Sequence, residues 1–168
     1  MKRIASWLGL AKDTTKERSP LRDVVDALEG LDAEQARHLA RFAYLLGRVA
    51  HADRHVSAEE TQAMERLVRE QGGLSADQSI LVVTLAKSSN VLFGATADFE
   101  VAREFSESAS YPQKLALARC LFAVAATDES ISMIEETEIH RIINHLRIEP
   151  PDLTAIRLAH RSFLPGLR

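Results

Sequence analysis

The sequence has one cysteine among 168 residues, and aromatic residues make up only 5%. A single cysteine excludes an intrachain disulfide. Because Cys120 stands in an apolar run, we expect a buried structural thiol in a reducing compartment. No apolar run approaches the roughly 18 to 20 residues that cross a bilayer, and the broken apolar start at residues 1 to 11 is not a secretory signal. We therefore expect a cytoplasmic protein, either free or peripheral at the inner face of the membrane.

Motifs of enzyme active sites are also absent. The sequence contains no Walker loop, no Rossmann glycines, no nucleophile elbow and no zinc-protease HExxH. Paired acids act as general acid and base only in a pocket that separates their pKa values, and nothing in the sequence predicts such a pocket. We expect a protein that is not an enzyme.

The charge is unevenly distributed. Residues 1–22 carry a net +4 and residues 154–168 a net +3, which leaves −10 for the body between them. An acidic body disfavours nucleic-acid binding and is compatible with cation binding. The basic first segment is read either as a frayed tail or as a short amphipathic helix that contacts a membrane or a partner, with apolar residues at helical spacing: Ile4, Trp7, Leu8 and Ala11.

A short pattern occurs twice, 75 residues apart. Asp53, Ser57 and Glu60 recur as Asp128, Ser132 and Glu135, each time after an apolar helical run. Identical residues before the two aspartates also match at this offset: Ala43 with Ala118, Leu46 with Leu121, Val49 with Val124, and Ala50 with Ala125. An internal duplication is the simplest explanation, and two copies favour a pseudo-symmetric globular pair over an open solenoid.

Helix-capping residues and glycines divide the chain into successive helices, and no stretch alternates like a strand. The sequence predicts an all-α, single globular domain of about seven to eight helices over residues 19–163, after a tail at 1–18. It is built from two three-helix units, about 33–88 and 110–161, joined by an extra helix at about 96–109. A loop is expected around Ser88 to Asn90, and the helix that starts near Pro112 is expected to lead to Asp128.

Each unit places an Asp at the exit of one helix and a Glu in the first turn of the next. If the units pack about a pseudo-twofold axis, the carboxylates of Asp53, Glu60, Asp128 and Glu135 converge, and such an oxygen cluster suits Ca²⁺, Mg²⁺ or Mn²⁺. From the residues alone, a purely structural reading is the preferred one, and the cation site is the alternative. Ser-x-x-Glu is a capping box, and an Asp in a turn bonds its own backbone.

Histidines offer a further metal reading at the first corner. His51, Asp53 and His55 have the spacing of a transition-metal site, but the second corner has Ala126 and Ser130 at the matching positions, so solvated histidines are the preferred interpretation. Two more histidines, His140 and His145, are five residues apart and poorly placed to share a helical face. We expect them to act individually, as surface or capping residues.

The two corners resemble the TerB-like tellurite-resistance family. The resemblance lies in Ala52-Asp53-x-x-Val56-Ser57-x-x-Glu60 and its repeat from Thr127 to Glu135, and extends over about residues 30–160. The family's helical domain also occurs at the N-terminus of some membrane-tethered DnaJ-type co-chaperones, although this chain has no His-Pro-Asp of a J-domain. The resemblance implies a helical domain that binds divalent metal through Asp53, Glu60, Asp128 and Glu135 in bacterial responses to tellurite and other stresses.

One departure from the family pattern affects the expected affinity. The family often has Gly directly after each Asp, where this chain has Arg54 and Glu129. Loss of Gly removes easy access to a left-handed turn, and Arg54 pairs readily with a carboxylate. Since the second corner has five acids before the first basic residue, Arg141, we expect tighter binding there. The rival function is a helical scaffold that binds a protein partner without metal.

Overall fold

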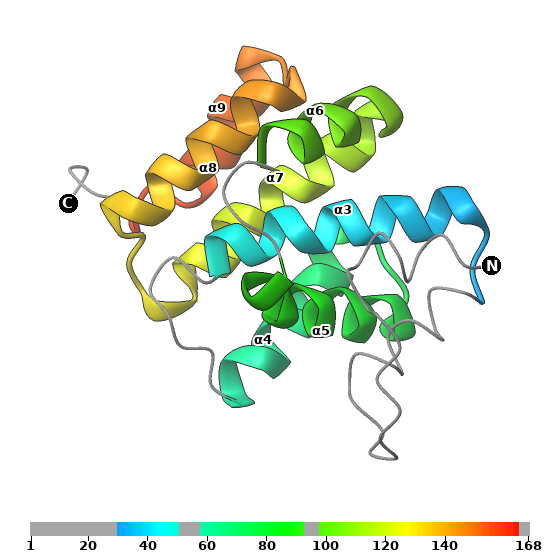
Figure 1. Ribbon diagram of the computed structural model, residues 1–168. Helices are drawn as coiled ribbons and strands as arrows, with labels where there is room; N and C mark the ends of the chain where they lie inside the picture. Colours follow the sequence, from blue (N-terminus) through cyan, green and yellow to red (C-terminus); the bar gives the residue numbers. More distant parts are fainter. Residues whose placement is uncertain (1–29, 51–57, 93–97, 165–168) are drawn as a thin grey trace.

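Seven α-helices and one short 3-10 helix make up the part of the chain that the computed structural model describes, residues 30–50, 58–92 and 98–164 (Figure 1). No strand occurs in these ranges, so the all-α class is confirmed. The predicted tail at 1–18, the helix predicted before Gly30, and the first corner with His51, Asp53 and His55 lie outside the described residues. The elements in order are α3 (Ala33–Ala50), α4 (Ala58–Gly72), α5 (Ala76–Leu92), α6 (Asp98–Ser108), α7 (Tyr111–Ala125), η2 (Ala126–Asp128), α8 (Met133–Leu146) and α9 (Pro150–Ala159).

The central helix is α3, which packs against α5, α6, α7 and α8. It begins where predicted, because Oδ1 of Asp32 accepts hydrogen bonds from the backbone N–H groups of Glu34 and Gln35, both at 3.0 Å. These bonds satisfy two of the four N–H groups that a helix leaves without partners at its start. The apolar residues recurring at helical spacing in α3 are almost fully buried, as the 3.6-residue period predicts.

A glycine and a reciprocal cap shape the turn from α4 into α5. Gly73 has a φ of +66°, a left-handed conformation that glycine adopts without steric cost, and it ends α4. The backbone N–H of Ser75 then donates to Oε1 of Gln78 at 3.0 Å, while the N–H of Gln78 donates to Oγ of Ser75 at 3.2 Å. These two bonds form a capping box, the arrangement that Ser75 and Gln78 predict at a helix start.

The predicted end of α5 was wrong. A loop was expected around Ser88 to Asn90, but α5 continues to Leu92. Ser and Asn disfavour a helix interior by only a few tenths of a kcal/mol relative to average residues. The preceding turns hold buried side chains such as Val82 and Ala86 against the rest of the molecule, and that packing outweighs the local preference.

The second half of the fold begins at Ser110, whose N–H donates to Oε1 of Gln113 at 2.7 Å. The helix predicted to lead to Asp128 is regular only to Ala125, and the 3-10 helix η2 covers the last turn. Such tightening is common at helix ends, where four carbonyl groups lack partners. A helix, α6, lies where the connecting helix was predicted, and it packs on α3 and α8.

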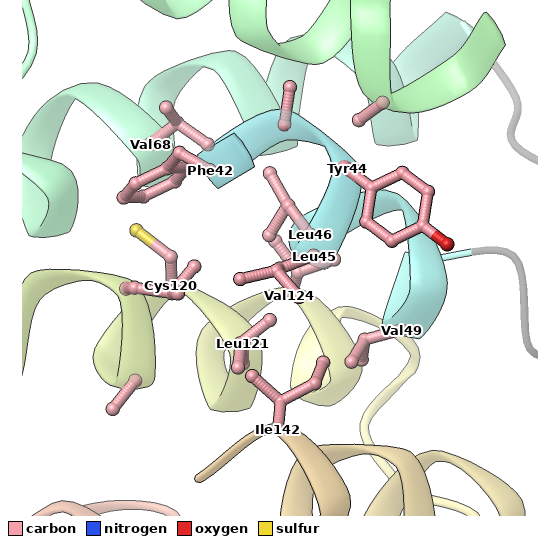
Figure 2. Close-up of a cluster of buried hydrophobic side chains, with 14 of the residues drawn as sticks. Phe42, Tyr44, Leu45, Leu46, Val49, Val68, Cys120, Leu121, Val124 and Ile142 are labelled. Carbon is pink, nitrogen blue, oxygen red and sulfur yellow. The ribbon is translucent and has the colours of Figure 1, made fainter. Parts of the chain in front are cut away.

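The two halves pack on each other reciprocally. α4 lies against α7, α8 lies against α3, and α3 and α7 are themselves in contact. Figure 2 shows Leu46 and Val49 of α3 in one buried cluster with Leu121 and Val124 of α7. These are residues that the 75-residue offset matches with one another. The duplication itself stays a prediction from the sequence.

Candidate functional site

The second corner turns sharply after α7. The hydroxyl of Thr127 donates to the backbone carbonyl of Val124 at 2.6 Å, and the N–H of Glu129 donates to the carbonyl of Ala126 at 3.1 Å. Glu129 has φ 59° and ψ 9°, which is the left-handed conformation. The sequence comparison with the family pattern identified this as a position that favours glycine, and this chain adopts the same turn with glutamate at a steric cost.

A complete capping box opens α8. Oε2 of Glu135 accepts from the backbone N–H of Ser132 at 2.7 Å, and Oγ of Ser132 accepts from the N–H of Glu135 at 3.2 Å. The buried Ile131 fixes the corner further, because its N–H donates to the carbonyl of Phe163 at 2.8 Å. The predicted capping function of Ser132 and Glu135 is thus confirmed. The bond occupies one oxygen of the carboxylate, so capping and cation binding do not exclude each other.

Of the four predicted ligands, only Glu135 has a described side chain. Asp53 lies outside the described residues. Glu60 is the third residue of α4 and Asp128 the last of η2, and the structure describes the backbone of both. Among the residues in 30–50, 58–92 and 98–164 whose side chains are placed, no three His, Cys, Asp or Glu gather as a metal site would need. The four-carboxylate cluster therefore stays a prediction.

Arginines from distant parts of the sequence reach the acids of α8. Glu138 pairs with Arg141 at 2.7 Å and with Arg48 of α3 at 3.4 Å, and Glu136 pairs with Arg157 of α9 at 3.1 Å. In the sequence, Arg141 is the only basic residue close to these acids. Arg48 and Arg157 could not be foreseen as their partners, since their proximity depends on tertiary packing. The negative charge near the second corner is therefore smaller than the sequence suggests.

The two histidines of α8 act individually, as predicted. Nε2 of His140 lies 2.6 Å from a guanidinium nitrogen of Arg157. His145 instead meets the ring of Phe99 edge to face, with the ring centroids 5.0 Å apart. Their different partners rule out a shared ligand pair in the described conformation.

Cys120 is fully buried, and its Sγ lies 3.9 Å from the carbonyl oxygen of Leu67. Burial raises the pKa of its thiol to about 12. The predicted burial of this thiol is confirmed.

A comparison with models of protein families shows to which family this chain belongs. The family model described as tellurite resistance protein TerB matches residues 39–158. This chain belongs to the TerB family. The match covers most of the chain, including both corners, and TerB is not known as a family of enzymes. No curated protein and no solved structure matches the chain.

In the ranges that the structure describes, no helix of this TerB domain is both long enough and apolar enough to span a membrane.

Proposed function

We propose that this TerB domain binds a hard divalent cation, Ca²⁺, Mg²⁺ or Mn²⁺, through Asp53, Glu60, Asp128 and Glu135. The domain would serve a non-enzymatic role in a bacterial stress response of the tellurite-resistance type. It would act in the cytoplasm, where a lone buried thiol stays reduced. Contact of the basic first segment with a membrane remains a separate prediction.

The observation that carries the proposal is the reciprocal packing of the two halves. Val49 and Val124 lie in one buried cluster near the ends of α3 and α7 (Figure 2). Each valine precedes the aspartate of its corner by the same four residues, Asp53 in one case and Asp128 in the other. Both helices also end at the left side of the molecule in Figure 1. Because the two valines lie in one cluster and each is followed by an aspartate at the same distance in sequence, the two corners are expected to lie close together. This proximity supports a shared carboxylate site.

The chemistry of the four residues fits a hard cation. Carboxylates are the ligands that Ca²⁺ and Mg²⁺ prefer, and the set contains no sulfur or imidazole that would favour a softer metal. The cost of bringing negative groups together is partly offset at Glu135, because this carboxylate accepts a backbone N–H at the start of α8, where the helix dipole favours negative charge.

Two variants at the second corner separate cation binding from helix capping. Glutamine also completes a capping box, so Glu135→Gln keeps the bond to Ser132 and removes the charge. Ser132→Ala does the reverse, because it removes the cap and keeps the carboxylate. We expect Ser132→Ala to cost about 1 kcal/mol of stability and still bind the cation, and Glu135→Gln to retain its stability and bind at least tenfold more weakly.

The measurement is calorimetric titration with Ca²⁺, Mg²⁺ and Mn²⁺, supported by thermal unfolding with and without each ion. Asp128→Asn removes a second carboxylate charge at the same corner and should also weaken cation binding. Asp53→Asn removes the aspartate of the first corner, so weaker cation binding in this variant would show that both corners contribute to one site. Binding unchanged in Glu135→Gln and Asp128→Asn, or no binding at millimolar ion, would contradict the proposal.

The capping box itself favours a second candidate function. A TerB domain in which Glu135 serves only to cap α8 would be a helical scaffold for a protein partner, without metal. That function predicts that Ser132→Ala and Glu135→Ala are equally destabilised and that no divalent ion raises the melting temperature.

A further inference from the structure

Two surface hollows meet on the side of the molecule formed by α6 and α8. The first, of about 300 Å³, is floored by Leu45, Ala102 and Ile142 and lined by charged residues of α3 and α8. The second, of about 290 Å³, lies between α6, from Phe99 to Glu107, and the C-terminal end of α8. Both hollows are lined by Phe99 and His145, and the two together are here called the α6–α8 groove.

An exposed aromatic ring stands at the centre of this groove. Phe99 is 57% exposed although it is large and apolar. Its ring is held edge to face by His145 at 5.0 Å, and the guanidinium carbon of Arg103 lies 5.9 Å from the ring centroid. Because two neighbours already hold this ring in place, it loses little side-chain entropy when a ligand covers it. Aromatic residues with such a low ordering cost often contribute most of the binding energy of an interface.

The charged residues of the groove are predominantly basic. Four arginines and two glutamates line the two hollows, in a chain whose formal net charge is −3. In the first hollow, Arg48 and Arg141 share the single carboxylate of Glu138, at 3.4 and 2.7 Å. The side chain of Arg141 is 68% exposed, so its guanidinium group remains accessible to a second carboxylate from the solvent side.

The second hollow repeats this arrangement. Arg103 and Arg147 line it together with Glu107, and the only ion pair between them and this acid, Arg103 with Glu107, is long at 3.9 Å between exposed side chains. Such a pair contributes little and is easily exchanged for another carboxylate. Each hollow therefore offers a positive subsite beside the shared Phe99 and His145.

We propose that the α6–α8 groove binds an acidic segment of a partner protein, in which two carboxylates flank an apolar or aromatic side chain. The carboxylates would pair with the arginines of the two hollows, and the apolar side chain would cover Phe99. Arg141 and Arg147 are six residues apart, about 9 Å along α8 at 1.5 Å per residue. An extended peptide covers that distance in about three residues, which sets the spacing of the two acids.

Charge favours such a peptide over a nucleic acid. Basic grooves with an aromatic platform also bind single strands, but a phosphate backbone needs a continuous positive track. Here Glu107 and Glu138 lie between the arginines and interrupt such a track. A short acidic peptide needs only two positive subsites.

The test is selection of a displayed library of random short peptides on the full chain. Peptides that also bind a Phe99→Ala/Arg141→Gln double variant are removed, and the selected consensus is then measured by fluorescence anisotropy. Exposed matched controls outside the groove are Met133→Ala and Arg69→Gln. We expect a consensus with two acids about three residues apart around an apolar residue. Phe99→Ala should weaken its binding at least tenfold, Arg141→Gln and Arg103→Gln each severalfold, and the controls less than twofold.

Three results would overturn the proposal: no enriched consensus, a consensus without acids, or binding that the groove variants leave unchanged. If oligothymidylate bound more tightly than the consensus peptide and lost affinity in the same way on Phe99→Ala, that result would overturn the peptide proposal and identify a single-stranded nucleic acid as the ligand of the groove. Measurements in Ca²⁺ and in excess chelator keep this inference separate from the proposed cation site, since the groove needs no metal and none of its variants alters a proposed ligand.

Discussion

The hydroxyl of Tyr111 at the start of α7 donates a 2.6 Å hydrogen bond to Oδ2 of Asp152 in the first turn of α9. The hydroxyl oxygen of Tyr111 also accepts a hydrogen bond from the backbone N–H of Glu149 at 3.1 Å. One phenol therefore joins the beginnings of two helices whose sequence positions differ by about forty residues.

Removing this hydroxyl should loosen α9 without changing the rest of the fold. The hydrogen bond to Asp152 raises the pKa of the Tyr111 phenol above 10.0, so its stabilising effect is complete below pH 10 and is lost as the pH rises through the higher pKa of the folded state. We expect Tyr111→Phe to lower the melting temperature at neutral pH, and the difference from wild type to shrink in alkali. Equal melting temperatures at pH 7 would contradict this.

His38 should make stability depend on pH in the acid range. Its ring stacks on Phe105 with the centroids 5.2 Å apart, and burial, then the charge of Arg41, lowers its pKa below 6.5. As the pH falls below 6.5, the unfolded chain gains a proton before the folded one, so stability decreases until the folded pKa is passed. We expect His38→Gln to flatten this decrease in a pH series of melting temperatures. An identical slope in both proteins would refute the assignment.

Cys120 should be unreactive in the folded protein. A rise of its pKa from 9.0 to about 12 reduces the thiolate fraction at pH 8 about a thousandfold, and burial blocks access as well. We expect iodoacetamide to label Cys120 only in proportion to the unfolded population, so that the labelling rate follows the denaturation curve. Rapid labelling of the native protein would show that the thiol is accessible.

Glu129 occupies a conformation that costs it energy. At φ 59° a non-glycine residue is disfavoured by about 1 to 2 kcal/mol. We expect Glu129→Gly to stabilise the protein by about 0.5 to 1 kcal/mol in chemical denaturation, because relief of strain exceeds the entropy that glycine adds to the unfolded chain. Glu129→Ala is the control, since it removes the carboxylate and keeps the strain. Stabilisation by alanine equal to that by glycine would assign the effect to charge.

Helix starts were predictable because they depend on local chemistry. Asp32, Ser75 and Ser132 all cap helices through hydrogen bonds to residues two or three positions later, and such bonds leave a clear sequence pattern. The end of α5 was missed because packing of its buried turns, and not its last residues, determines how far it continues.

The candidate site was predictable only in part. The capping role of Glu135 follows from Ser-x-x-Glu, whereas the arginines opposite Glu136 and Glu138 come from α9 and α3. The α6–α8 groove was not foreseen either. Phe99 was interpreted as one of the apolar residues of the connecting helix, and nothing local distinguishes an apolar residue that is buried from one that stays at the surface.

The reciprocal packing of α4 on α7 and of α8 on α3 has a consequence for how the molecule holds together. A chain cut between Ser108 and Tyr111 would yield two fragments, and each would expose the face on which the other's second helix normally rests. Each fragment would lose part of its buried surface, although α5 still packs on α3 and α4 in the first one, so mixing the fragments should restore helicity that each partly loses in isolation. Such interdependence makes unfolding cooperative across the junction between the halves.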